Sequence, residues 1–137
     1  MMSRIDASHR YAVLEMGANH AGEISYLTEL AAPDVVVITN AAAAHLEGFG
    51  SIEGVAHAKA EILQGEPRPG IAVLNSDDEY YPYWLSLVEG VDVLSFGIND
   101  DADIRASQIE TGKGQTHFTM HLLDSTIELT LPLAGVH

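Results

Sequence analysis

The sequence contains no cysteine, few positive charges and no long hydrophobic run. Without cysteine the chain can form neither a disulfide scaffold nor a zinc or iron–sulfur site with cysteine ligands. The longest apolar runs, such as Val35–Ile38, are far shorter than the roughly 20 residues that a membrane-spanning helix needs. The first residues also lack the apolar core of a secretory signal, so we expect a cytoplasmic protein.

Positive charge is scarce, because six Lys and Arg stand against 20 Asp and Glu and give a formal net charge of −14. Such a chain repels phosphate backbones and anionic lipid surfaces, so we expect neither nucleic acid nor membrane as a partner. No Lys or Arg occurs between Arg10 and Lys59, which makes Lys59 an isolated cation in an acidic stretch. With 137 residues, 47% of them hydrophobic, the chain can still build the core of one globular domain.

The order of apolar segments predicts an α/β fold with a mostly parallel open sheet flanked by helices, followed by a small antiparallel meander. After a leader at residues 1–10, we expect the parallel part over 11–99 and the meander over 100–137 of the same domain. The parallel part has predicted strands at 11–15, 34–39, 71–74 and 91–96, and predicted helices at 23–31, 51–64 and 82–88. The continuous β-branched run at 34–39 indicates a strand covered on both faces. Period-two alternation at 103–109, 116–122 and 126–133 indicates the meander.

Ligands of open α/β sheets bind at the carboxyl ends of the strands, which places three loops, 15–22, 40–50 and 75–79, at a candidate site. Glu15 ends the first predicted strand, where a carboxylate can hold magnesium or cap the next helix. His45 in the second loop can be a ligand or a solvated side chain. Asn75 and Asp77 in the third loop can contact a nucleotide ribose or simply form the turn.

Lys59 lies on the apolar face of its predicted helix, together with Val55. A lysine there must extend to solvent, pair with an acid, or be chemically modified. Burial lowers the pKa of the amine and favours the neutral form, which reacts with carbon dioxide to give a carbamate. A carbamate is an oxygen donor suited to magnesium. The alternative is an ion pair with Glu15, Glu53 or Glu61.

Two histidines, His117 and His121, lie on one face of a predicted meander strand, opposite Phe118 and Met120. Neither has an acidic residue or a third ligand close in the sequence. We therefore interpret both as exposed sheet residues rather than metal ligands.

Several segments resemble the central domain of the Mur ligases. They are Glu15–Ile24, Thr39–Ser51, Ala58–Ile62, Asn75–Asp78 and Leu131–His137. The resemblance covers essentially residues 9–137. The residues after Glu15 are similar to those of family members that add D-Ala-D-Ala to a UDP-N-acetylmuramoyl tripeptide in peptidoglycan precursor synthesis.

The resemblance implies an ATP-dependent amide-bond ligase. In that family ATP phosphorylates the tripeptide carboxylate, and the amine of D-Ala-D-Ala attacks the acyl phosphate. Carried over by motif, Glu15 binds one magnesium ion between the ATP phosphates, and His45 and carbamylated Lys59 act catalytically by binding a second. Two metal ions that clamp the reacting oxygens suit this phosphoryl transfer.

The same resemblance assigns Asn75, Asp77 and His137 to nucleotide binding. It also implies a Gly-rich phosphate loop, ending in Gly-Lys-Thr or Gly-Lys-Ser, before the Glu15 strand, and this sequence has none. Lys113 does follow a glycine, but it lies in a predicted hairpin turn and lacks the loop's spacing.

We therefore expect a piece of a central domain that has no ligase or ATPase activity on its own. In this piece we expect Lys59 to be largely unmodified and paired with an acid. Unpaired strand edges and uncovered apolar surface would favour self-association. The alternatives are another ligase of the same superfamily, such as a folylpolyglutamate synthase, or a non-catalytic module that binds a metal or a partner.

Overall fold

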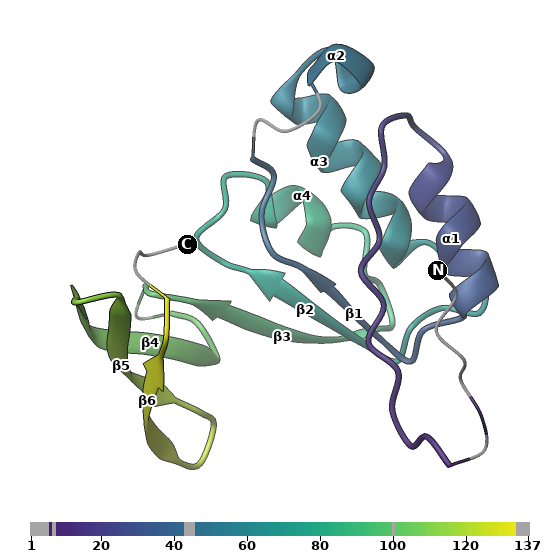
Figure 1. Cartoon of the computed structure of the whole chain (residues 1–137). Helices are drawn as coiled ribbons and strands as arrows, with labels where there is room; N and C mark the ends of the chain where they lie inside the picture. Colours follow the sequence, from purple (N-terminus) through teal and green to yellow (C-terminus); the bar gives the residue numbers. More distant parts are fainter. Residues whose placement is uncertain (1–5, 7, 43–45, 100, 134–137) are drawn as a thin grey trace.

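A computed structural model of the chain describes residues 6, 8–42, 46–99 and 101–133. Its centre is a six-stranded sheet in the order β1-β2-β3-β4-β5-β6 (Figure 1). The strands are β1 (Val35–Ile38), β2 (Ile71–Asn75), β3 (Asp92–Gly97), β4 (Ile104–Gly112), β5 (Gln115–His121) and β6 (Thr126–Leu131). β1 to β4 pair in parallel, and β4 to β6 pair antiparallel. The predicted parallel sheet with an appended meander is therefore confirmed.

The helices are α1 (Glu23–Ala31), α2 (Leu46–Phe49), α3 (Ile52–Ala60), the 3-10 turn η1 (Glu61–Leu63) and α4 (Tyr81–Leu85). Ser51 caps α3, because its hydroxyl accepts a hydrogen bond from the Gly54 N–H at 3.0 Å. α2 lies inside the predicted loop 40–50, so that loop prediction is wrong in part. Of the helices in the described ranges, none is long and apolar enough to cross a membrane.

The prediction of a first strand at 11–15 is wrong, because these residues form no strand. Tyr11 and Val13 are 83% and 97% exposed. The run has the apolar composition of a strand, but a strand also needs a neighbour that accepts its backbone hydrogen bonds. In the part of the chain that the structure describes, residues 11–15 pair with no other strand.

The core lies between one face of the parallel strands and helices α3 and α4. Val36 and Ile38 of β1 are 2% and 3% exposed, and Leu74 of β2 is fully buried. Trp84 of α4 is fully buried as well, and its indole N–H donates to the Ala56 carbonyl of α3 at 3.1 Å. This hydrogen bond satisfies the one polar atom of the largest core side chain and joins the two helices.

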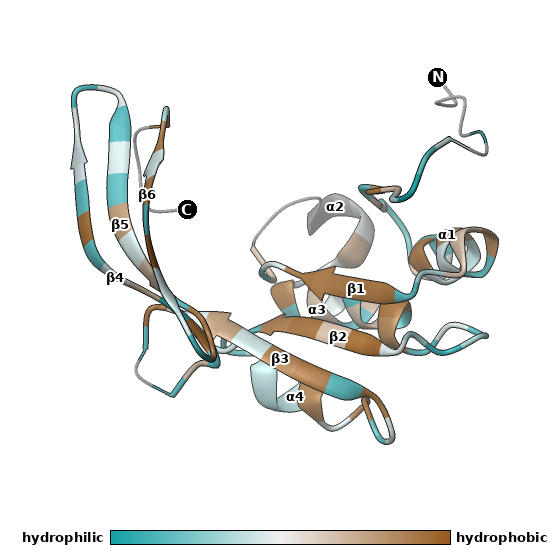
Figure 2. Cartoon of the chain, turned by 90° about the horizontal axis from the view of Figure 1, so that it is seen from below, coloured by the Kyte–Doolittle hydropathy of each residue, from teal (hydrophilic) through white to brown (hydrophobic). Residues whose placement is uncertain are grey.

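On the other face of the parallel strands, no helix of the described residues packs. In Figure 2 strands β1 to β3 lie in front of α3 and α4, which leaves the nearer face open. Val35 and Val37 point to this face and are 49% and 51% exposed, so the predicted burial of β1 on both faces is wrong here. Strand register places further apolar residues on the same face, namely Val73, Leu94, Phe96, Ile104, Phe118, Met120, Ile127, Leu129 and Leu131. We call this set the open apolar face.

The meander is turned away from the parallel strands (Figure 1). A β-bulge interrupts the β4–β5 register between Ser107 and Glu110, which bends the sheet locally. The β4–β5 hairpin turns through Lys113 and Gly114, whose φ angles of 52° and 77° fit a tight two-residue turn.

Candidate functional site

The carboxyl ends of β1 and β2 are joined by side chains from the turn after β2. The Asn75 amide N–H donates to the Thr39 carbonyl at 2.8 Å, and the Asp78 carboxylate accepts from the Ala41 N–H at 2.7 Å. The side-chain Oδ1 of Asn75 accepts from the Asp77 N–H at 2.9 Å. This geometry supports the turn-forming interpretation of Asn75, because both ends of its amide are engaged.

Asp77 binds the loop that follows β3. Its carboxylate accepts from the Ile98 N–H at 2.6 Å and from the Asn99 side-chain amide at 2.5 Å. A Cβ at Gly97 would lie 2.7 Å from the Asp77 carboxylate, so a larger residue there would have to displace that side chain. Asp77 therefore fixes the β3–β4 connection to the β2–α4 turn.

Lys59 reaches the same edge of the sheet from α3. Its ammonium donates to the Asn40 carbonyl at 2.5 Å, just after β1. Burial lowers the pKa of the half-buried Lys59 amine, and the negative charge of Asp78 raises it in part. A lowered pKa makes the neutral, nucleophilic amine more accessible, as carbamate formation requires.

The predicted ion pair of Lys59 with Glu15, Glu53 or Glu61 is wrong. No carboxylate of the described residues lies within salt-bridge distance of the Lys59 ammonium. Lys59 is held instead by a main-chain carbonyl, with Asp78 as the acid that acts on its charge.

Glu15 is exposed in the segment before α1, and its carboxylate forms no hydrogen bond or ion pair with another described residue. Two other carboxylates bind backbone N–H groups of this loop. Glu23 accepts from the Asn19 N–H at 2.7 Å, and Glu61 accepts from the Gly22 N–H at 2.7 Å. Of these three carboxylates, Glu15 alone accepts no hydrogen bond from the described residues. The structure does not join Glu15 to Lys59 by any hydrogen bond or ion pair.

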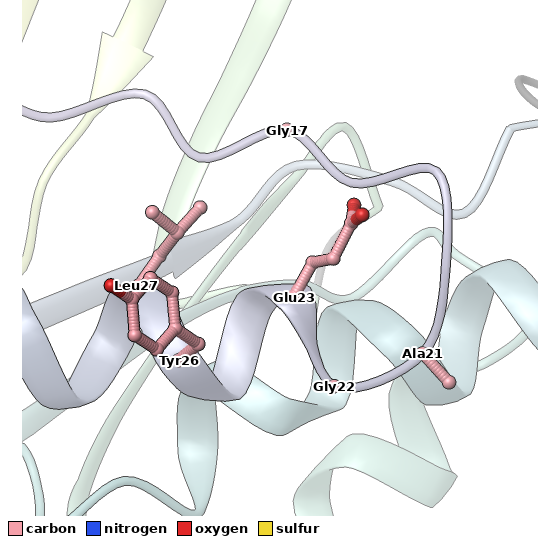
Figure 3. A pocket seen from close by; sticks show the side chains of 6 residues that line it. All are labelled: Gly17, Ala21, Gly22, Glu23, Tyr26 and Leu27. Atoms are coloured by element: carbon pink, nitrogen blue, oxygen red, sulfur yellow. The ribbon is translucent and has the colours of Figure 1, made fainter.

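An open pocket of about 500 Å³ lies between this loop and the outer side of α1 (Figure 3). Its lining is mostly apolar and consists of Gly17, Ala21, Gly22, Glu23, Tyr26 and Leu27. Glu23 is the charged member, and its carboxylate already binds the Asn19 and His20 N–H groups. The pocket therefore presents mainly apolar surface, and its one charged side chain is already hydrogen-bonded.

The remaining histidine predictions have mixed outcomes. His45 and His137 lie outside the described residues. His121 is half-buried rather than exposed, and its Nε2 is 2.7 Å from the Ser107 hydroxyl. His117 is exposed as expected, and its Nδ1 is 2.7 Å from the Thr130 hydroxyl. Within the described ranges, no three His, Asp or Glu side chains form a group that could hold a metal ion.

The chain is an α/β domain with a cluster of polar side chains at the carboxyl edge of its parallel strands, and comparison with known proteins specifies the family. Residues 1–137 match the Mur ligase middle domain, so the chain belongs to the Mur ligase family.

Individual relatives are similar over nearly the whole chain. UDP-N-acetylmuramoyl-tripeptide–D-alanyl-D-alanine ligase of Escherichia coli K12 is 41% identical over 135 residues, which are 98% of this chain and 30% of that protein. A crystal structure of MurF from Acinetobacter baumannii aligns with a TM-score of 0.88 and 31% identity, over 96% of this chain and 28% of that one. MurF from Thermotoga maritima in complex with ADP aligns with a TM-score of 0.68 and 30% identity, over 82% and 26%. The chain thus spans about 30% of the length of its relatives.

A likeness of fold alone extends to L. casei FPGS, at 24% identity and a TM-score of 0.65. The alternative interpretation, a folylpolyglutamate synthase, therefore has weaker support than the interpretation as a D-alanyl-D-alanine ligase.

Two residues of this edge were missed by sequence reasoning. Asp78 was expected either to contact a nucleotide ribose or to form the turn, but its carboxylate binds the Ala41 N–H and its charge acts on Lys59. Glu61 was considered only as an ion-pair partner, yet it binds the start of α1. Their contacts span 36 to 39 residues, so local spacing contains no signal for them.

Proposed function

We propose that the chain is the middle domain of an ATP-dependent ligase that joins D-Ala-D-Ala to a UDP-N-acetylmuramoyl tripeptide in peptidoglycan precursor synthesis. The observation that carries the proposal is the half-buried Lys59, held by the Asn40 carbonyl at the carboxyl edge of β1. The D-alanyl-D-alanine ligases to which the chain is similar, one of them in complex with ADP, support the substrates and ATP.

The residues present fit magnesium in part. Carboxylate oxygens are the donors that magnesium prefers, and Glu15 carries an exposed carboxylate with no partner among the described residues. Lys59 supplies such oxygens only after it gains a carboxylate as a carbamate, and its lowered pKa favours that reaction. Magnesium, when bound, would supply positive charge beside the ATP phosphates. Ligation by His45 stays a prediction from the family motif.

The chain's own residues shape the nucleotide edge. Asn75, Asp77 and Asp78 join the ends of β1, β2 and β3 through hydrogen bonds, and this keeps the edge rigid where a ligand would bind. Direct nucleotide contact by Asn75, Asp77 or His137 stays a prediction, as does cytoplasmic location.

Replacing Lys59 in a full-length ligase that contains this middle domain tests the proposal. Lys59→Ala should nearly abolish formation of the amide product, because the carbamate oxygens are lost. A short carboxylic acid such as acetate should restore part of the activity by entering the vacated space. Lys113→Ala, in the exposed hairpin turn, is the matched control and should keep full activity. Near-normal ligation by Lys59→Ala would refute the proposal.

The isolated chain offers a second test. It contains no Gly-Lys-Thr or Gly-Lys-Ser phosphate loop, so we expect it to hydrolyse no ATP. Phosphate release measured with purified chain, ATP and magnesium checks this. Appreciable magnesium-dependent hydrolysis would contradict it.

A further inference from the structure

Helix α1 begins without a side-chain cap of its own. Its N-cap residue is Gly22, which has φ of 87° and no side chain to accept a hydrogen bond from the first turn. The first N–H groups of a helix have no partner within the helix and need one elsewhere. A distant residue supplies it here. Glu61 Oε1 accepts from the Gly22 N–H at 2.7 Å, and Glu61 Oε2 accepts from the Ser25 N–H at 3.0 Å.

Glu61 lies two residues after Lys59, where α3 continues into η1. The end of α3 is therefore attached at two points. Lys59 binds the Asn40 carbonyl after β1, and Glu61 binds the start of α1. A carboxylate with two N–H donors at a helix N-terminus is a charge-assisted contact that also complements the helix dipole.

The loop before α1 is attached to the same helix start. Glu23 Oε2 accepts from the Asn19 N–H at 2.7 Å and from the His20 N–H at 3.4 Å. The loop that follows Glu15 is thus bound to α1, and α1 is bound to the helix that carries Lys59. No other side-chain hydrogen bond joins α1 to α3 or η1 in the part of the chain that the structure describes.

We propose that Glu61 is a positioning residue that fixes the Glu15 loop relative to Lys59. This inference rests on the proposed function, in which Glu15 and Lys59 hold magnesium. Glu61 itself touches neither metal nor substrate. It acts through the N-terminus of α1, and its loss should allow the loop to move while the fold persists.

The contact itself is tested in this chain by amide hydrogen exchange. In Glu61→Ala the amides of Gly22 and Ser25 should exchange at least about tenfold faster, because a charge-assisted acceptor is lost. Glu61→Gln keeps one acceptor oxygen and should give a smaller increase. Glu66→Gln removes the same charge from an exposed position nearby and should change neither amide. Wild-type exchange rates for Gly22 and Ser25 in Glu61→Ala would overturn the inference.

The positioning role is tested in a full-length ligase that contains this domain, by varying the magnesium concentration. Glu61→Ala should raise the magnesium concentration for half-maximal ligation about tenfold, leave the KM for D-Ala-D-Ala unchanged, and unfold at nearly the wild-type temperature. Glu66→Gln should match wild type. Faster exchange of Gly22 and Ser25 with an unchanged magnesium requirement would show a purely structural contact and overturn the role. Full activity of Lys59→Ala would instead refute the proposed function, whatever the exchange result.

Discussion

The two faces of the parallel strands have the same chemistry and different surroundings. Within the four residues of β1, Val36 and Ile38 are 2% and 3% exposed, whereas Val35 and Val37 are 49% and 51% exposed. Helices α3 and α4 cover the first pair, and nothing in the described structure covers the second. A strand meant to face water on one side usually alternates apolar and polar residues, and β1 does not. The comparison indicates that the open apolar face is a surface for burial.

The assignment of the covered face as the core can be tested with substitutions of two adjacent residues in α4. Trp84 is fully buried, and Leu85 is 44% exposed. Trp84→Ala should lower the free energy of unfolding by about 3–5 kcal/mol, because it leaves a large cavity and removes the hydrogen bond to the Ala56 carbonyl. Leu85→Ala should cost less than about 1 kcal/mol. Urea unfolding of both variants measures the difference, and similar losses would contradict the assignment of the core.

The same contrast can be tested within β1. Val36→Ala should destabilise the chain by roughly 1–3 kcal/mol, because the removed methyl groups are buried against the helices. Val37→Ala should cost less than about 1 kcal/mol, since its side chain is half exposed in the native state. The two unfolding curves give the comparison directly. A larger loss for Val37→Ala would mean that the open face is covered in solution.

Self-association is the expected consequence of the open apolar face, and we predict dimers or larger species at high concentration. Leu131→Lys adds a charge to this face at the 42% exposed end of β6, and should raise the apparent dissociation constant about tenfold, or about 1.4 kcal/mol. Thr126→Lys adds the same charge to the opposite face of β6 and is the matched control. Light scattering across a wide concentration range measures both. A wild-type chain that stays monomeric throughout would refute the prediction.

The smallest expected change in stability concerns the contact between β3 and the segment just before β4. The Asp103 carboxylate accepts from the Ser95 N–H at 2.8 Å and from its hydroxyl at 2.7 Å, and these hydrogen bonds lower the pKa of Asp103. A lowered carboxyl pKa adds stability at neutral pH that is lost as pH falls through that pKa. Asp103→Asn should therefore be slightly less stable than wild type at neutral pH. The difference should shrink as pH falls through the lowered pKa of Asp103, because the wild-type carboxylate then becomes protonated and loses its charge. A pH-independent difference would contradict this account.

The sequence predicted most of the sheet because its signals there are local. The β-branched run before Asn40 and the alternation around Phe118 were sufficient for β1 and β5. Ser51 was expected as a helix cap and is one. These features depend on neighbours within a few residues.

The failures have a common cause, which is dependence on distant partners. Residues 11–15 have strand composition, yet a strand exists only with a neighbour, and none is present in the described chain. The open face of β1 depends on which elements pack against it. Lys59 was expected to pair with an acid, but its contact with the Asn40 carbonyl depends on how α3 lies against the sheet. Glu61 binds α1 across 36 to 39 residues for the same reason.

We propose that Lys59 acts as a carbamate at the carboxyl edge of β1 in a full-length ligase. The most direct measurement is carbon-13 NMR of that ligase after incubation with labelled bicarbonate and magnesium. We predict a carbamate carbon signal in wild type that is missing in Lys59→Ala and present in Lys113→Ala. The isolated chain, in which we expect Lys59 to be largely unmodified, should show little of it. A wild-type ligase without the signal, or a Lys59→Ala variant that keeps it, would contradict the claim.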